Sequence, residues 1–162
     1  RFLEEEENLL LRDNVKMHFT ASAWVLNPSK NKVLMLYHNI YQSWSWSGGH
    51  ADGEGDLLSV AMKEVKEESG LVSLKPLSDS PISIEILGVQ PHYKKQKYVS
   101  AHLHLNYTFL LHNTKEEKLK ICPEENSKVG WLSPDEAVRS STEAWMKPIY
   151  KKLNQKMRKY LG

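Results

Sequence analysis

The sequence predicts a mixed α/β fold in which one mixed β-sheet is sandwiched between helices as α-β-α layers. Short apolar and β-branched runs alternate with stretches of helical period, an order typical of layered α/β domains. The 162 residues suit one compact domain. Hydrophobic residues make up 40% of the chain, enough for a core without disulfides, and Cys122 is the single cysteine. We therefore expect residues 1–162 to form a single domain.

The N-terminal part predicts a helical extension followed by a hairpin. Residues 1–16 contain four consecutive glutamates and then three leucines, which favour a short helix lying on the domain. Residues 17–26 are mainly β-branched, aromatic and small, and residues 33–37 form a short apolar run. Turn-forming residues at 27–31 separate the two runs, which indicates an antiparallel hairpin.

A well-delimited helix is predicted over residues 56–69. Asp56 suits the N-cap, and Gly70 suits the left-handed position that ends a helix. Apolar residues recur at helical spacing and predict one buried stripe, formed by Leu58, Ala61, Met62 and Val65.

The remaining elements complete the layered order. Residues 82–89 and 99–111 are predicted strands, and the second carries His102, His104 and Asn106 on one face. Residues 129–132 form a last short strand, and Pro134 begins a short helix over 135–139. Residues 143–160 predict a longer C-terminal helix.

Composition and charge disfavour several classes of partner. The net charge is +2, so no general attraction to nucleic acid or membranes is expected. No apolar run approaches the roughly 20 residues needed to cross a bilayer. The sequence shows no signal peptide, and one cysteine fits a reducing compartment, so we expect a cytoplasmic protein. A homodimer is left open.

Three glutamates on the helix over residues 56–69 indicate a metal site. Glu64, Glu67 and Glu68 fall within an arc of about 100° beside the buried stripe, with an axial spread of about 6 Å. Such close like charges destabilise a helix, and the last turn disfavours anions further. A hard divalent cation such as Mg²⁺ would resolve the conflict. The alternative is a solvated face screened by two nearby lysines, Lys63 and Lys66.

The segment before this helix is rich in glycine. Residues 48–55 contain four glycines in eight positions, which predicts a loop. Glycine allows a backbone to approach a ligand closely, and its carbonyl can ligate a hard cation. The loop and the three one-sided glutamates together are much more specific than either alone.

The segment from Gly49 to Leu71 resembles the Nudix box. That pattern has a glycine, a spaced glutamate and then the run Arg-Glu-apolar-x-Glu-Glu-x-Gly-apolar, and here the run is Lys-Glu-Val-Lys-Glu-Glu-Ser-Gly-Leu at 63–71. Two positions depart from it: Lys63 replaces the arginine, and Gly55 replaces the spaced glutamate. Glu54 and Asp56 flank Gly55, and either is a candidate to replace that acid.

The resemblance implies a Nudix-like fold and a set of functional residues. Glu67 and Glu68 are expected to be the principal Mg²⁺ ligands, with Mn²⁺ as a substitute. Glu64 is expected to be a further ligand or the general base, and the Gly48 carbonyl a backbone ligand. A base outside the box is also considered: Glu125 is preferred over Glu124, against the alternative of a solvated loop acid.

Substrate-binding residues are sought outside the box. Trp44 and Trp46 share one side of an extended segment and are candidates to stack on a base, with core packing as the alternative. His92 lies in a basic segment that is a candidate to grip a phosphate. His102 and His104 are expected to form one wall of the cleft rather than a zinc site. The basic C-terminal helix is interpreted as a solvated face.

The sequence therefore predicts Mg²⁺-dependent hydrolysis of a pyrophosphate bond in a nucleoside diphosphate linked to another group. ADP-ribose, a dinucleotide and a nucleoside triphosphate are candidate substrates. Two alternatives stay open: a non-catalytic nucleotide-sensing module and an RNA 5′-end pyrophosphohydrolase. The expected partner is a small nucleotide derivative, with nucleic acid disfavoured.

Overall fold

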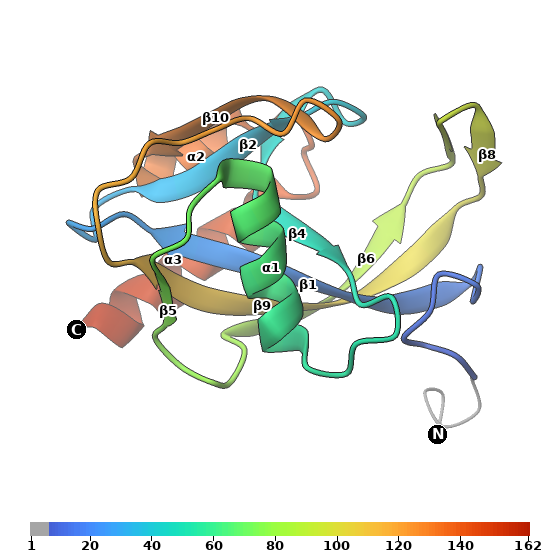
Figure 1. Cartoon of the computed structure of the whole chain (residues 1–162), viewed down its shortest axis with the longest axis horizontal. Coiled ribbons are helices and arrows are strands. Elements are labelled where there is room, and N and C mark those ends of the chain that lie inside the picture. Colours follow the sequence, from blue (N-terminus) through green and yellow to red (C-terminus); the bar gives the residue numbers. More distant parts are fainter. Residues whose placement is uncertain (1–6) are drawn as a thin grey trace.

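A computed structural model describes residues 7–162 and shows helices on both sides of a mixed sheet (Figure 1). No helix in this part of the chain has the length and apolar character of a membrane span. The strands are β1 (Met17–Leu26), β2 (Val33–His38), β3 (Ser43–Ser45), β4 (Ser47–His50), β5 (Leu74–Pro76), β6 (Ser83–Val89), β7 (His92–Lys94), β8 (Lys97–Val99), β9 (His102–Asn113) and β10 (Asn126–Leu132). The helices are α1 (Leu57–Ser69), α2 (Pro134–Ser140) and α3 (Lys147–Leu161).

The sheet is organised around the parallel pair of β1 and β9. These strands run in register from Met17 opposite Leu103 to Leu26 opposite His112. The main order is β10-β2-β1-β9-β5, and β3, β4 and β6 pair with β2, β1 and β9 respectively. Strands β7 and β8 form a separate hairpin that projects from the body (Figure 1). Residues far apart in sequence are thus brought side by side on the two longest strands.

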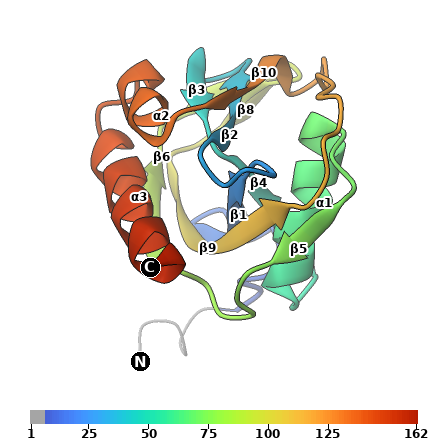
Figure 2. The same cartoon turned by 90° about the vertical axis from the view of Figure 1, so that its left-hand side faces the viewer.

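Two apolar cores hold the layers together, one on each face of the sheet. Helix α1 packs Val60, Ala61 and Val65 against one face. Helix α3 packs Tyr150, Leu153 and Met157 against the other, where Tyr150 stacks on Trp24. Figure 2 shows α1 and α3 on opposite sides of the strands. The predicted α-β-α layering is confirmed.

The predicted signals at the ends of α1 are confirmed. The Asp56 carboxylate accepts a hydrogen bond from the Ser59 backbone N–H at 3.1 Å, which satisfies a free donor of the first turn. Gly70 ends the helix at φ 77°, a conformation that glycine adopts without a steric penalty. These caps fix the start and the end of the segment that carries the glutamates.

Several predicted elements need correction. Residues 7–16 form turns rather than the expected helix, and residues 1–6 lie outside the described part. The C-terminal helix begins at Lys147 rather than 143, with a proline in its first turn. The strand predicted over 99–111 is interrupted at residues 100–101 and extends to Asn113. Strands β3, β5 and β7 were not predicted, because three residues are too few to establish a period.

Candidate active site

The predicted metal site lies where α1 packs against β4. Glu68 is 5% exposed, and its carboxylate accepts hydrogen bonds from the Ser47 hydroxyl at 2.8 Å and the Gly48 N–H at 3.0 Å. In an extended strand, the N–H and C=O of one residue point toward the same edge. The Gly48 carbonyl is therefore directed to the side on which Glu68 lies, and its role as a metal ligand stays a prediction.

The two glycines of β4 do not lie where the sequence predicted them. They belong to a strand paired with β1, not to a loop. A Cβ on Gly49 would lie 2.3 Å from the Glu64 carboxyl carbon, and a Cβ on Gly48 would lie 2.8 Å from the Ala21 carbonyl oxygen. Glycine is thus required because β1 and the Glu64 side chain of α1 both approach the β4 backbone closely.

The three glutamates do not all point the same way. Glu64 and Glu68 face β4, whereas the Glu67 side chain is 55% exposed and lies 3.8 Å from the Lys63 ammonium. Lys63 therefore pairs with one carboxylate, as its replacement of arginine predicts. Within residues 7–162, the only set of three potential ligands with donor atoms all within 4.8 Å of one another is a histidine group, not the glutamates.

Burial makes the inward-facing acids difficult to ionise. Desolvation raises the pKa of Glu68 to about 8, although its two hydrogen bonds act in the opposite direction. Desolvation also raises the pKa of Glu64, and the negative charge of Glu67 adds to this effect. A divalent cation would compensate both carboxylates, so their position and chemistry fit Mg²⁺.

The acids that flank Gly55 are used in local capping. Glu54 accepts a hydrogen bond from the Asp56 N–H at 2.8 Å, and Asp56 caps α1. Nothing lies within 4 Å of a Cβ built on Gly55. Both flanking acids are exposed and bond to the start of α1, so replacement of the box acid by either one stays a prediction.

Glu125 lies at the same site, in the segment before β10. Its negative charge contributes to the raised pKa of both Glu64 and Glu68, and its neighbour Asn126 bonds the Glu68 backbone carbonyl, so this segment reaches the end of α1. On its other side lies Lys94 of the projecting hairpin, with 4.0 Å between the ammonium and carboxylate. Glu124, the other candidate, is exposed. The arrangement favours Glu125 as the acid facing the site.

Sequence reasoning missed Asn126, which positions this segment. It is 1% exposed, and its amide nitrogen donates to the Glu68 backbone carbonyl at 2.9 Å. Its amide oxygen accepts from the Cys122 N–H at 3.2 Å. Asn126 thus connects the Glu125 segment to the end of α1. An asparagine before a short strand gives no signal of such a contact in sequence.

The predicted substrate-binding residues lie in different places. Trp44 and Trp46 pack partly buried against the core on the α3 side, with the Trp46 ring edge-on to Tyr150 at an interplanar angle of 72°. The packing alternative is thus observed, and base stacking stays a prediction. His92 is half-buried on β7, with one ring nitrogen 2.9 Å from the Gln90 carbonyl.

His102 and His104 belong to a cluster that the sequence did not reveal. His18 of β1 and His50 of β4 join them, with His50 ring centroids 5.1 Å from His18 and 5.0 Å from His104. Burial lowers the pKa of His50 to about 3 and of His104 to about 2, so both rings are neutral near pH 7. Only the pairing of β1 with β4 and β9 unites these residues, which is why sequence spacing gave no signal.

The comparison with known protein families agrees with the fold described above. The model of the NUDIX domain matches residues 16–153. This protein belongs to the Nudix family. The matched range contains α1, the Glu125 segment and every buried residue of the two cores except Met157. Membership confirms the predicted hydrolase acting on pyrophosphate bonds and favours an enzyme over the non-catalytic sensing module.

Solved structures support the Nudix fold. An Ap4A hydrolase from C. elegans, in a binary complex, superposes with a TM-score of 0.63 at 18% identity, covering 85% of this chain and 95% of that one. A Nudix-family hydrolase from Clostridium perfringens gives 0.63 at 17% identity, with coverages of 87% and 96%. The E. coli dihydroneopterin triphosphate pyrophosphohydrolase gives 0.59 at 16%, with coverages of 83% and 92%. The sequence has no significant match among curated proteins.

Proposed function

We propose that this Nudix enzyme hydrolyses the pyrophosphate bond of a small nucleoside diphosphate derivative, with Mg²⁺ bound between α1 and β4. The observation that carries the proposal is the packing of half-buried Glu64 and buried Glu68 against the Gly48–Gly49 backbone. Glu64, Glu68 and the Gly48 carbonyl would hold the ion, and Glu67 on the solvent side would complete the set. The bound ion would supply Lewis-acid polarisation of the phosphate oxygens.

Residues of the chain itself are proposed to carry out the other steps of the reaction. Hydrolysis adds the oxygen of water to one phosphorus and breaks the P–O–P bridge, which leaves two phosphate-terminated products. Glu125, between the acid site and Lys94, is the group proposed to accept the proton of the attacking water. Lys94 places a positive charge beside the position proposed for the substrate phosphates.

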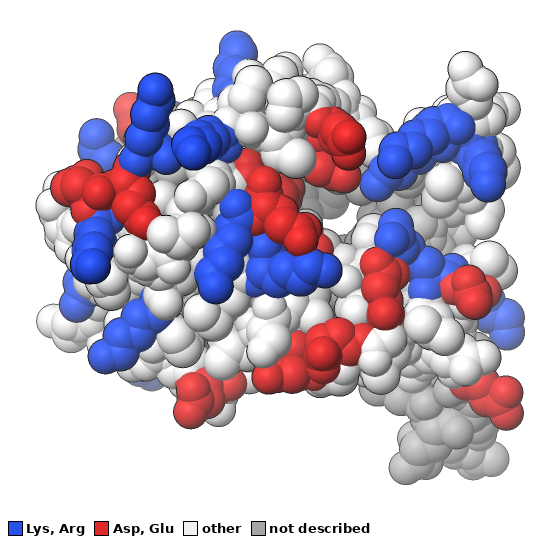
Figure 3. Space-filling view, viewed as in Figure 1, with Lys and Arg blue, Asp and Glu red and all other residues white. Residues whose placement is uncertain are grey.

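The surface beside the site fits a small polyanionic substrate. Figure 3 shows a hollow between the main body and the projecting β7–β8 hairpin, with acidic side chains on the body and basic side chains opposite them. The hairpin contributes Lys94 and Lys97 at its strand ends. A diphosphate that bridges a cation at the acids and the lysines of the hairpin would satisfy both charges.

The contacts of α3 support the prediction that nucleic acid is not the substrate. Lys152 pairs with Glu85, and Arg158 lies 3.1 Å from Asp135. The Lys156 ammonium donates to the Ile82 carbonyl at 2.6 Å. Basic residues that make these contacts within the domain do not form a free stripe for an RNA backbone.

A substrate panel tests the proposal. The purified protein is assayed with ADP-ribose, dinucleoside polyphosphates, nucleoside triphosphates and a 5′-triphosphorylated oligonucleotide, each with Mg²⁺, Mn²⁺ or EDTA. We expect metal-dependent release of phosphate-terminated products from a small nucleotide, reduced at least about 10²-fold by Glu68→Gln. A matched exposed variant, Asp79→Asn, should keep full activity. Turnover in EDTA, or a preference for the oligonucleotide, would contradict the proposal.

A further inference from the structure

The histidine cluster lies on the opposite face of β4 from the acid site. The Cβ direction of Gly49 meets Glu64, and side chains of successive strand residues point to opposite faces. The side chain of the next residue, His50, therefore leaves the strand on the other face, where its ring adjoins His18 and His104. The cluster is thus separate from the carboxylates proposed to hold Mg²⁺.

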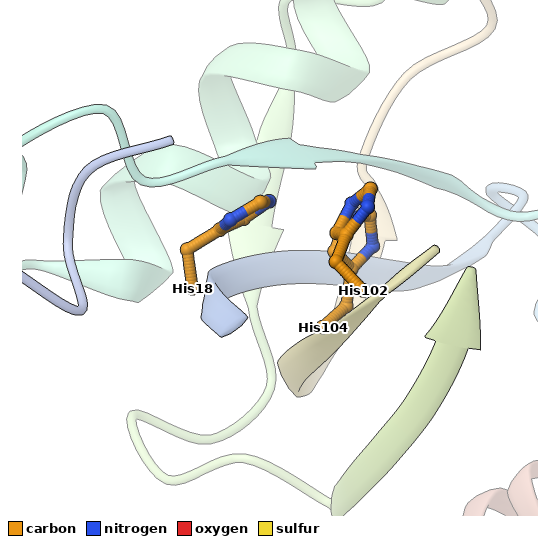
Figure 4. Close-up of side chains that lie close together, drawn as sticks. All are labelled: His18, His102 and His104. Carbon is orange, nitrogen blue, oxygen red and sulfur yellow. The ribbon is translucent and has the colours of Figure 1, made fainter. Parts of the chain in front are cut away.

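Three of these histidines bring their ring nitrogens together. One nitrogen from each of His18, His102 and His104 lies within 4.8 Å of the others, and the Nε2 atoms of His102 and His104 are 3.1 Å apart. The rings project from β1 and β9 into one space (Figure 4). Ligands at about 2.0–2.1 Å around a tetrahedral ion are separated by a little over 3 Å, so small ring movements would complete such a geometry.

In two of the three histidines, His18 and His102, the opposite ring nitrogen is held in the manner of metal-bound histidines. His18 Nδ1 lies 3.0 Å from the Asn14 carbonyl, and His102 Nδ1 lies 2.8 Å from the Ser100 carbonyl. A carbonyl only accepts, so Nδ1 carries the proton and Nε2 presents its lone pair. Such backbone contacts orient histidine ligands and fix their tautomer.

His18 gives an independent sign that a ligand is required. The residue is 4% exposed, and its Nε2 is a buried polar atom without a hydrogen-bond partner. Leaving a buried acceptor unpaired costs on the order of 1–3 kcal/mol, so its position calls for a compensating contact. The nearby positive charge of Arg12 is balanced by Asp52 through two contacts of 2.8 Å.

We propose that His18, His102 and His104 form a second metal site, selective for a divalent transition metal such as Zn²⁺. Neutral imidazoles suit Zn²⁺, Co²⁺ and Ni²⁺, whereas Mg²⁺ takes oxygen ligands. Three histidines leave a fourth position for water or a substrate atom, and the His50 ring lies beside two of the ligands, His18 and His104. The site is independent of the carboxylates, so the proposed hydrolysis and this binding fail or succeed separately.

Metal binding by the folded protein tests this inference. Zn²⁺ is titrated calorimetrically in a large excess of Mg²⁺, and Co²⁺ is added separately as a spectroscopic probe. We expect one equivalent of Zn²⁺, a visible Co²⁺ absorption typical of low coordination number, and a raised melting temperature. His102→Gln and His104→Gln should each weaken Zn²⁺ at least about tenfold. His102 is partly exposed, so its variant should fold, as circular dichroism would verify.

Two control variants make the result specific. His92→Gln removes a histidine outside the cluster, and Glu68→Gln alters the carboxylate site; both should retain Zn²⁺ affinity. Loss in Glu68→Gln with retention in His102→Gln would place the ion at the acids and overturn the inference. Absence of a Zn²⁺ equivalent in the wild type, or equal loss in His92→Gln, would overturn it as well.

Discussion

Replacing Glu68 with glutamine should stabilise the metal-free protein at alkaline pH while it removes activity. The carboxylate is 5% exposed, with hydrogen bonds from Ser47 and Gly48 as its polar contacts. Glutamine has nearly the same shape and retains an acceptor oxygen for both donors. The substitution therefore removes a buried charge without removing the packing around it.

The magnitude follows from the pKa of the buried group. Burial raises the pKa of Glu68 from 4.5 to about 8. At pH 8 this shift lowers the free energy of unfolding by about 4 kcal/mol, since one pKa unit corresponds to about 1.4 kcal/mol. Water that enters the metal-free site reduces this cost, so we use about 2 kcal/mol, or roughly 4–8 °C in Tm for a domain of this size. Because the pKa is raised in the fold, the cost is absent below about 4.5 and grows as the pH rises toward about 8.

Thermal melts in EDTA provide the assay. Wild-type protein and Glu68→Gln are compared at about pH 5 and about pH 8, and the change in their Tm difference is the quantity of interest. Any fixed cost of the glutamine amide is the same at both pH values and cancels in that change. The burial argument would be refuted if the Tm difference did not change with pH. It would also be refuted if the wild type were more stable than Glu68→Gln at pH 8 by about 2 kcal/mol.

Three further predictions concern the supports of the site. Gly49→Ala should displace the Glu64 side chain, since a Cβ would lie 2.3 Å from its carboxyl carbon. The variant should lower kcat/KM by about 10²-fold, whereas its free energy of unfolding in urea should fall by only about 1 kcal/mol. An unaltered kcat/KM would contradict the close contact between Gly49 and Glu64. Glu125→Gln should lower kcat by about 10²- to 10⁴-fold, whereas its exposed neighbour variant Glu124→Gln should not; similar rates for both would exclude Glu125 as the base. Asn126→Ala should cost roughly 1–3 kcal/mol in urea unfolding, because it leaves a buried backbone carbonyl unpaired, and a loss within error would show that water replaces the amide.

Much of the fold was predictable because its signals are local. The bounds of β1 match the predicted residues 17–26, which are mainly β-branched, aromatic and small. Helix α1 lies where Asp56 and Gly70 place its ends, since capping depends on residues within one turn. The same reasoning was wrong for the N-terminal segment. Three leucines favoured a helix there, but residues 7–16 form turns.

The candidate site was only partly predictable. Helical geometry placed Glu64 and Glu68 on one face, yet it also grouped Glu67 with them, because an arc of about 100° does not say where a neighbouring strand will lie. The position of β4 separates the two buried acids from the exposed one. Likewise, the glycines at 48 and 49 indicated close approach, but only the structure shows that the approaching groups are β1 and the Glu64 side chain.

The sequence by itself determined the family motif, the acid helix and the layered class, because periodicity, caps and motif spacing act over a few residues. Tertiary structure alone decided which distant residues meet. The pairing of β1 with β9 and β4 brings His18 beside His50, His102 and His104. A shift of one residue in that register would send these side chains to the other face. Which strands become neighbours depends on contacts between residues far apart in the chain, so the cluster could not be predicted from local patterns.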